Sequence, residues 1–108
     1  MSRTSPRCKP VPREVRQTAD LLERRWQLSI IYAALTGALR FNEFAEAVAG
    51  ISPRMLSERL RDLEAAGLVE RTVIPSSPPT VEYRLTARGR KLGPIIDAMR
   101  AYAGDPVG

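Results

Sequence analysis

The spacing of apolar residues changes abruptly at Gly67, and this change limits the folds open to the chain. Before it, Leu56, Leu60 and Leu63 recur at the period of an α-helix with one buried face. After it, residues 68–74 are a β-branched run, and residues 81–86 alternate apolar and polar side chains with a period of two, which is the period of a strand. A chain that makes this change once and late is predicted to be mostly helical with a small sheet.

Two helices are predicted just before the change. The longer covers residues 52–66, because Ser52 is a preferred N-cap, Pro53 a preferred first helical residue and Gly67 a preferred C-terminal cap. A shorter helix fits residues 42–48, with Asn42 as its N-cap. A tight turn at Gly50-Ile51 joins them, as in a helix-turn-helix.

A hairpin is predicted directly after the longer helix. Its strands cover residues 68–74 and 81–86, and a stiff polar loop that contains three prolines joins them over residues 75–80. Along the second strand, Val81, Tyr83 and Leu85 share one side. Two helices followed by a hairpin predict an α+β, mostly α fold, a winged helix-turn-helix with a two-stranded β-hairpin wing.

Further helices are expected on both sides of this unit. The first begins near Pro12, with a stripe of Val15, Ala19 and Leu22 that Trp26 continues; a central helix at 26–36 is apolar on two sides. Thr86 is expected to cap a last helix, which Pro94 should kink or delay. We therefore expect a flexible basic arm over 1–12, one domain over 13–103 and a frayed tail over 104–108.

Residues for enzymatic or metal chemistry are scarce. The chain has no histidine, the commonest general base and metal ligand, and its single cysteine cannot complete a zinc site. Its glycines are scattered singly, so no phosphate-binding loop is present. No segment approaches the roughly 20 apolar residues of a membrane span, and no apolar segment follows the basic N-terminus. We expect a cytoplasmic protein that is not an enzyme and has no cofactor, no metal and no membrane partner.

Charge favours a polyanion as the partner. Basic residues outnumber acidic ones by 17 to 12, and nearly all of them are arginine, which binds phosphate and guanine edges bidentately. The face of the 52–66 helix opposite its leucines carries Arg54, Glu58 and Arg61. The predicted DNA-binding residues are Ser52, Arg54, Met55, Ser57, Glu58 and Arg61 on this helix, Arg71 and Arg84 on the strands, and Ser76, Ser77 and Thr80 in the loop.

Each of these features has a plainer interpretation. The helix could be an ordinary surface helix in which Glu58 pairs with Arg54 or Arg61. The loop could be a rigid connector, since it lacks the arginine that a wing usually carries near its tip. The hairpin placed immediately after the helix favours the DNA-binding interpretation.

The motifs resemble those of the HxlR-type family of winged-helix regulators, which are relatives of the MarR-like repressors. The resemblance covers about residues 8–102. The matching segments are residues 40–44 (RFNEF), 50–64 (GISPRMLSERLRDLE), 67–71 (GLVER) and 78–86 (PPTVEYRLT), together with Trp26 and Gly89. The chain departs from the family where Glu23-Arg24-Arg25 stands in place of the usual small residues before the second helix.

The resemblance implies a homodimer whose interface is built from the first and last helices. The residues on the two corresponding stripes are Val15, Ala19, Leu22, Leu92, Ile95, Ile96, Met99 and Tyr102. The alternative is that both stripes close the core of a single chain. In some family members a cysteine followed by proline senses oxidants; Cys8 lies in that region, although Lys9 separates it from Pro10. Basic neighbours would favour its reactive thiolate, and the alternative is an inert thiol.

These observations together predict a transcriptional regulator, most simply a repressor, that binds double-stranded DNA and is nucleoid-associated when bound. A two-fold dimer would place two 52–66 helices in successive major grooves of a partly palindromic operator, with half-sites about 34–36 Å apart. Two alternatives stay open: a protein–protein interaction module of the same fold, and a nonspecific DNA-binding protein. The operator, the regulated genes and any small-molecule ligand are not encoded in a readable pattern.

Overall fold

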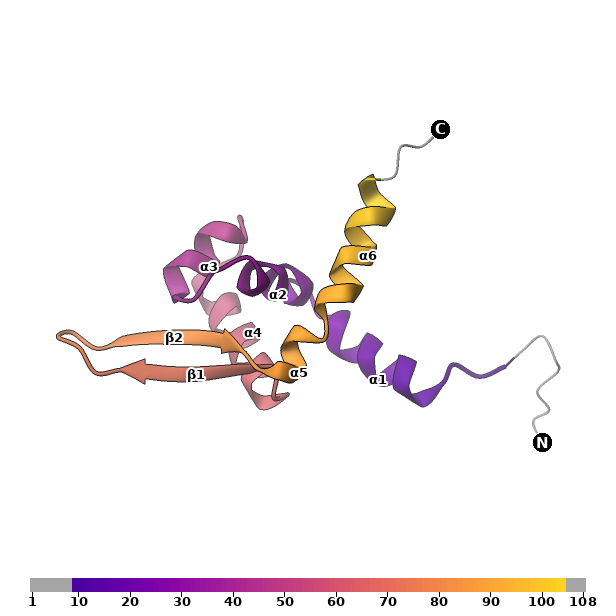
Figure 1. The fold of residues 1–108 in the computed structure, drawn as a ribbon, viewed down its shortest axis with the longest axis horizontal. Helices are drawn as coiled ribbons and strands as arrows, with labels where there is room; N and C mark the ends of the chain where they lie inside the picture. The colour runs from indigo at the N-terminus through magenta and orange to yellow at the C-terminus, as the bar shows by residue number, and fades with distance from the viewer. Residues whose placement is uncertain (1–8, 105–108) are drawn as a thin grey trace.

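The computed structural model describes residues 9–104, and Figure 1 shows how the helices and the hairpin are arranged. The elements are α1 (Arg13–Leu22), α2 (Gln27–Leu35), α3 (Phe41–Ala47), α4 (Pro53–Ala65), β1 (Val69–Ile74), β2 (Thr80–Leu85), α5 (Ala87–Arg90) and α6 (Gly93–Gly104). This is the predicted winged helix-turn-helix, mostly helical with one two-stranded antiparallel sheet.

The core forms where α2, α3 and α4 meet the base of the hairpin. Ile30 and Ile31 of α2 and Phe44 of α3 are fully buried, and so are Leu56 and Leu63 of α4. Burying a side chain of this kind is worth about 1.5–3 kcal/mol. The leucine stripe predicted for the helix before Gly67 is thus confirmed as the face that holds α4 in place.

The junction between α1 and α2 differs from the prediction. We expected Trp26 to continue the stripe of the first helix, but α1 ends at Leu22. Trp26 has a left-handed backbone (φ 76°) and is the N-cap of α2, which changes the direction of the chain. Its ring packs against the core, and the guanidinium of Arg25 lies 4.7 Å from the ring centroid.

The start of α3 also differs. We expected Asn42 as the N-cap, but the N-cap is Arg40. The reason is Glu43, whose Oε1 accepts hydrogen bonds from the backbone N–H groups of Leu39 (2.8 Å) and Arg40 (2.9 Å). These bonds satisfy amides that a helix start leaves unpaired. They favour the ionised carboxylate, so the bonds from Arg40 and then Leu39 lower the pKa of Glu43 below its usual value of 4.5.

A lowered pKa in the folded protein predicts a stability that depends on pH. The contribution of Glu43 is fully present above 4.5 and is lost as pH falls through the lower pKa of the folded state. Glu43→Gln keeps an acceptor oxygen but cannot titrate. We expect the Tm difference between wild type and Glu43→Gln to shrink on acidification from neutral pH, as measured by circular dichroism. A difference that is constant with pH would contradict this role.

The hairpin is attached to the body at its base and at one edge. In its register Val69 pairs with Leu85 and Arg71 with Tyr83. The Tyr83 amide donates to the carbonyl oxygen of Leu39 (2.8 Å), which joins β2 to the loop between α2 and α3. Val81, Tyr83 and Leu85 share one face, as predicted.

The last helical segment is divided. Thr86 caps a helix as expected, because its hydroxyl accepts from the Gly89 amide (3.1 Å), but this helix is the short α5. The same hydroxyl donates to the Gly67 carbonyl oxygen (2.7 Å) and so holds the end of α4. A separate helix, α6, starts at Gly93, with Pro94 in its first turn where a missing N–H costs nothing.

The hairpin and the terminal helices lie at opposite ends of the molecule. In Figure 1 the hairpin extends to one side of the α2–α4 body, whereas α1 and α6 project from the other. None of the helices within residues 9–104 is long and apolar enough to cross a membrane. The two ends therefore offer two separate surfaces.

Candidate nucleic-acid interface

Helix α4 presents its charged residues to solvent because its leucines face the core. Its start is fixed by Ser52, whose hydroxyl accepts from the Met55 amide (3.0 Å). On the outward side, the side chain of Arg54 is 90% exposed and its Nε lies 3.4 Å from Oε2 of Glu58. This is the ion pair expected if α4 were an ordinary surface helix. An exposed pair of this kind stabilises the fold by only about 0.3–0.5 kcal/mol, so Arg54 is free to exchange partners.

The next turn of α4 leads into a groove beside the hairpin. Arg61 donates to the hydroxyl of Ser57 (3.3 Å), one turn earlier on the same side of the helix. A hollow of about 400 Å³ lies between α4 and the sheet; its lining residues are Ser57, Leu60, Arg61, Glu64, Arg71 and Tyr83. The fold therefore brings Arg61 and Arg71 to one groove, as expected for a surface that follows a phosphate backbone.

Arg84 does not join this groove. Paired residues of an antiparallel sheet share a face, so Arg71 and Tyr83 lie on one face and Glu70 and Arg84 on the other. On that second face Arg84 forms an ion pair with Glu82 (2.8 Å). Of the two strand arginines predicted to bind DNA, the structure places only Arg71 beside α4.

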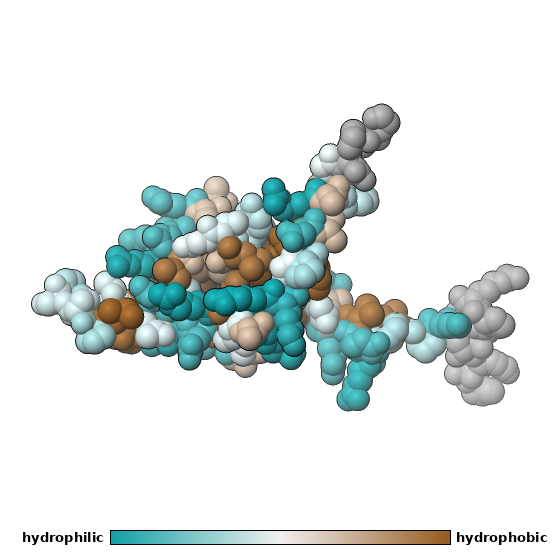
Figure 2. Space-filling model, in the orientation of Figure 1, coloured by the Kyte–Doolittle hydropathy of each residue, from teal (hydrophilic) through white to brown (hydrophobic). Residues whose placement is uncertain are grey.

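The loop of the hairpin is exposed, but one of its hydroxyl groups already makes a hydrogen bond within the loop. The hydroxyl of Ser76 donates to the carbonyl oxygen of Pro78 (2.7 Å), so its one hydrogen is already used. Ser77 is exposed, and Thr80, the partner of Ile74, lies on the face of Arg84. Figure 2 shows an apolar spot near the tip of the hairpin. Among the apolar side chains of the hairpin, that of Val73 is exposed. Met55 is half-buried, which leaves it a small part of the outward surface.

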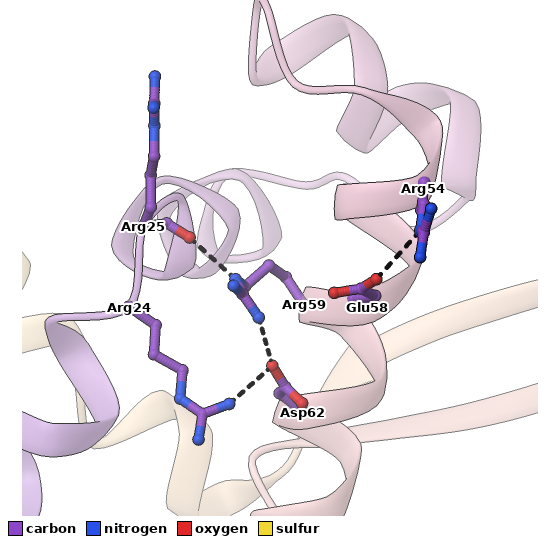
Figure 3. Close-up of polar contacts among 6 residues, drawn as sticks. All are labelled: Arg24, Arg25, Arg54, Glu58, Arg59 and Asp62. Carbon is purple, nitrogen blue, oxygen red and sulfur yellow. Dashed lines mark hydrogen bonds and ion pairs between the residues drawn. The ribbon is translucent and has the colours of Figure 1, made fainter.

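An arginine network behind α4 was not predicted. Oδ2 of Asp62 accepts from Arg59 (2.6 Å) and from Arg24 (2.9 Å), and Arg59 also donates to the Arg25 carbonyl oxygen (3.0 Å). Figure 3 shows these side chains converging between the α1–α2 turn and α4. Arg59 and Asp62 are three residues apart on one helix, a spacing that predicts contact between their side chains. Arg24 is 38 residues from Asp62, and nothing in the sequence predicts that contact.

The stripes assigned to a dimer interface divide into two groups. Leu92 and Ile96 are buried in the core of the chain itself. Ala19 and Leu22 are half-buried, and the exposed fractions of the remaining four are 50% for Val15, 38% for Ile95, 47% for Met99 and 85% for Tyr102. A shallow apolar groove of about 460 Å³ between α1 and α6 is lined mainly by Val15, Ala19, Leu22 and Ile95. Cys8 lies outside the described residues.

Known proteins match both the sequence and this geometry. The model of the HxlR-like helix-turn-helix family matches residues 21–107. The HTH-type transcriptional regulator YvaP of Bacillus subtilis is 41% identical over 87 residues, which is 81% of each chain. The reduced form of YodB from the same organism superposes with a TM-score of 0.77 at 37% identity, over 87% of this chain and 92% of that one. The redox regulator HypR in its oxidised form has a TM-score of 0.79 at 39% identity, over 88% and 98%.

Proposed function

The chain belongs to the HxlR-like helix-turn-helix family, and on this premise we propose that it is a sequence-specific transcriptional repressor that binds duplex DNA as a homodimer. The observation that carries the proposal is the outward face of α4 with the adjoining groove. Arg54 and Glu58, which are paired on the outward face of α4, would meet base edges, because the N-terminal half of a recognition helix normally reaches them. Arg61 and Arg71, which line the same groove, would bind the flanking phosphates.

A binding experiment separates this proposal from its alternatives. Fluorescence anisotropy would compare the DNA upstream of the protein's own gene with a scrambled duplex of equal length, near physiological salt. A preference of about a hundredfold or more is expected, within the usual range for specific binding. Equal and salt-sensitive binding to both duplexes would favour a nonspecific DNA-binding protein. Absence of binding to either would favour a protein–protein interaction module.

Arg54 provides the sharper test of the recognition helix. If it reads a base, Arg54→Ala should cost about 1–3 kcal/mol on the operator, which is a loss of about 5- to 150-fold. The loss on the scrambled duplex should be smaller, so discrimination between the two falls. Arg100→Ala is the matched control, because it removes the same charge from α6, where the guanidinium lies 5.8 Å from the Tyr32 ring. Equal losses for the two variants would remove Arg54 from the reading surface.

The dimer is proposed from the apolar surface shared by α1 and α6. Exposed apolar side chains gathered on two projecting helices cost solvation energy in a lone chain, and a second copy would cover them. A two-fold arrangement through this end would leave the α4 surfaces free. They would then meet half-sites about 34–36 Å apart.

We also propose that Cys8 makes DNA binding sensitive to oxidants. Of the related structures, YodB is known in reduced, diamide-treated and quinone-bound forms, and HypR in reduced and oxidised forms. Cys8 is the only cysteine here. Diamide would take two electrons and two protons from two thiols, one on each protomer, and leave one disulfide.

Diamide should therefore alter the operator affinity of the wild type, and dithiothreitol should restore it. The Cys8→Ser variant should bind the operator as the reduced wild type does and show no change with diamide. Anisotropy before and after treatment measures both. An identical response in Cys8→Ser would end the redox proposal without affecting the DNA-binding one.

A further inference from the structure

Helix α1 is attached to the body of the protein at its last turn. Within α1, which the structure describes in full, no side chain is buried, and contact with the core is made at its end by Leu21 and Leu22. By contrast, α6 is anchored by Ile96, which is buried in the core. The direction in which α1 leaves the body therefore depends on the turn that follows it, residues 23–26.

Asp62 of α4 holds this turn through two arginines. Its Oδ2 accepts from Arg24 of the turn (2.9 Å) and from Arg59 of α4 (2.6 Å). Arg59 also donates to the carbonyl oxygen of Arg25 (3.0 Å), so the turn is bound at two neighbouring residues (Figure 3). A carboxylate shared by two guanidinium groups forms a network, which contributes more than an isolated surface pair. The side chain of Arg59 is only 17% exposed, so its ion pair is partly shielded from salt.

The end of the turn lies against the helix-turn-helix. Trp26 has the left-handed backbone that redirects the chain into α2. A Cβ on Gly50, which lies in the turn between α3 and α4, would be 3.8 Å from Cη2 of the Trp26 ring. Residues 23–26 are therefore held at two places, by Asp62 in the second half of α4 and by the turn that precedes α4.

A small tilt of α1 would have a large effect at its far end. Its ten residues span about 15 Å, so a tilt of about 15° would move that end by about 4 Å. Successive base pairs of duplex DNA are about 3.4 Å apart. Because α1 lines the proposed dimer interface, such a tilt would change the separation of the two α4 helices by about one base pair.

We propose that Asp62 is a positioning residue that fixes the spacing of the two half-sites that the dimer reads. It acts without touching DNA, because it sets the angle between α1, through which the two copies meet, and α4, which meets each half-site. This inference rests on the proposed function. Loss of the Arg24 or Asp62 side chain frees the angle and lets the dimer accept more than one spacing.

The dependence of affinity on half-site spacing tests this role. Anisotropy would use the full-length protein and the duplex from upstream of its own gene, with zero, one or two base pairs inserted at the centre of the bound sequence. The wild type should lose at least about tenfold in affinity for each inserted base pair, and Arg24→Ala and Asp62→Ala about threefold or less. Arg88→Ala is the matched control and should keep the wild-type profile, because it removes the same charge as Arg24→Ala from an exposed position in α5.

Two results of this experiment would overturn the proposal. The first is a wild type that tolerates the insertions, because the spacing would then not be fixed. The second is a loss of affinity that is equal at every spacing in Arg24→Ala and Asp62→Ala. An equal loss is expected if these residues only stabilise the fold, or if Arg24 binds a phosphate itself.

A second measurement needs no DNA and separates this inference from the proposed function. Trp26 is the only tryptophan and is half-buried, so quenching of its fluorescence by acrylamide reports on the turn. Asp62→Ala takes away the ion-pair partner of Arg59, and the quenching constant should rise at least about twofold as the turn opens more often. Arg88→Ala should leave the constant unchanged, and circular dichroism should show that both variants are folded.

The two measurements together distinguish the possible failures. An unchanged quenching constant in Asp62→Ala would overturn the inference while operator binding by the wild type stands. A raised constant in a protein without preference for its upstream DNA would overturn the proposed function and, with it, the role of Asp62 in half-site spacing. The contact between the turn and α4 would then be structural alone.

Discussion

Replacing Gly89 with alanine is expected to destabilise the protein by about 3 kcal/mol or more. Gly89 lies in α5 and is buried against the base of the hairpin. A Cβ at this position would collide with the carbonyl oxygen of Leu68 and come within 2.9 Å of Cδ2 of Leu85. The Leu68 carbonyl also accepts from the Thr86 amide (3.0 Å), so it cannot move away without breaking that bond.

Gly93→Ala is the matched control for Gly89→Ala. It also lies at a helical position, but there a Cβ would meet its nearest neighbour, Cδ2 of Leu35, at an ordinary 3.9 Å. We expect Gly93→Ala to be neutral or to stabilise by about 0.4–1 kcal/mol. Urea denaturation gives both free energies, and the Tm of Gly89→Ala should fall by about 10–20 °C. Similar values for the two variants would mean that α5 is not packed closely on the base of the hairpin at Leu68 and Leu85.

Ile95→Glu should disrupt the proposed dimer. Ile95 is the α6 residue in the groove with α1, and its side chain is partly exposed in the single chain. A carboxylate there would be harmless in a monomer but would be buried without a partner between two copies, which costs several kcal/mol. We expect the dissociation constant of the dimer to rise at least about a hundredfold, which corresponds to about 2.7 kcal/mol.

Ala101→Glu controls for the added charge. Ala101 is exposed and lies one helical turn after Asp97, on a side of α6 that already carries a carboxylate. Light scattering coupled to size exclusion should show a dimer for wild type and Ala101→Glu and a monomer for Ile95→Glu. Loss of the dimer should also lower the affinity for the operator, because a lone chain contacts only one half-site. If Ile95→Glu stays dimeric, the two copies meet through another surface.

The parts of the fold that depend on local sequence were predictable. Each of these features depends on residues that are close in sequence: the stripe of Leu56, Leu60 and Leu63, the caps at Ser52 and Thr86, and the alternation along β2. Features that depend on long-range packing were not predictable. The left-handed backbone of Trp26 has no residue-type signal, because glycine and asparagine are the usual choices for that conformation.

The candidate site was only partly predictable for the same reason. The outward face of α4 follows from helical period, so Arg54, Glu58 and Arg61 were found from spacing. Whether a strand arginine faces α4 depends on the register of the hairpin, and a shift of one residue between the strands would put Arg71 and Arg84 on the same face. The N-cap of α3 was misplaced because asparagine is favoured by type, whereas the reach of Glu43 decides the position.

The bond between the Tyr83 amide and the Leu39 carbonyl oxygen involves main-chain atoms alone. Only proline at position 83 would remove the donor, so the angle at which the hairpin leaves the body is largely indifferent to side-chain identity. We therefore expect that residues 75–79 can be replaced by loops of other length or charge while β1 and β2 keep their positions. Laboratory recombination of this segment between relatives should yield proteins that fold alike and differ in what the loop contacts.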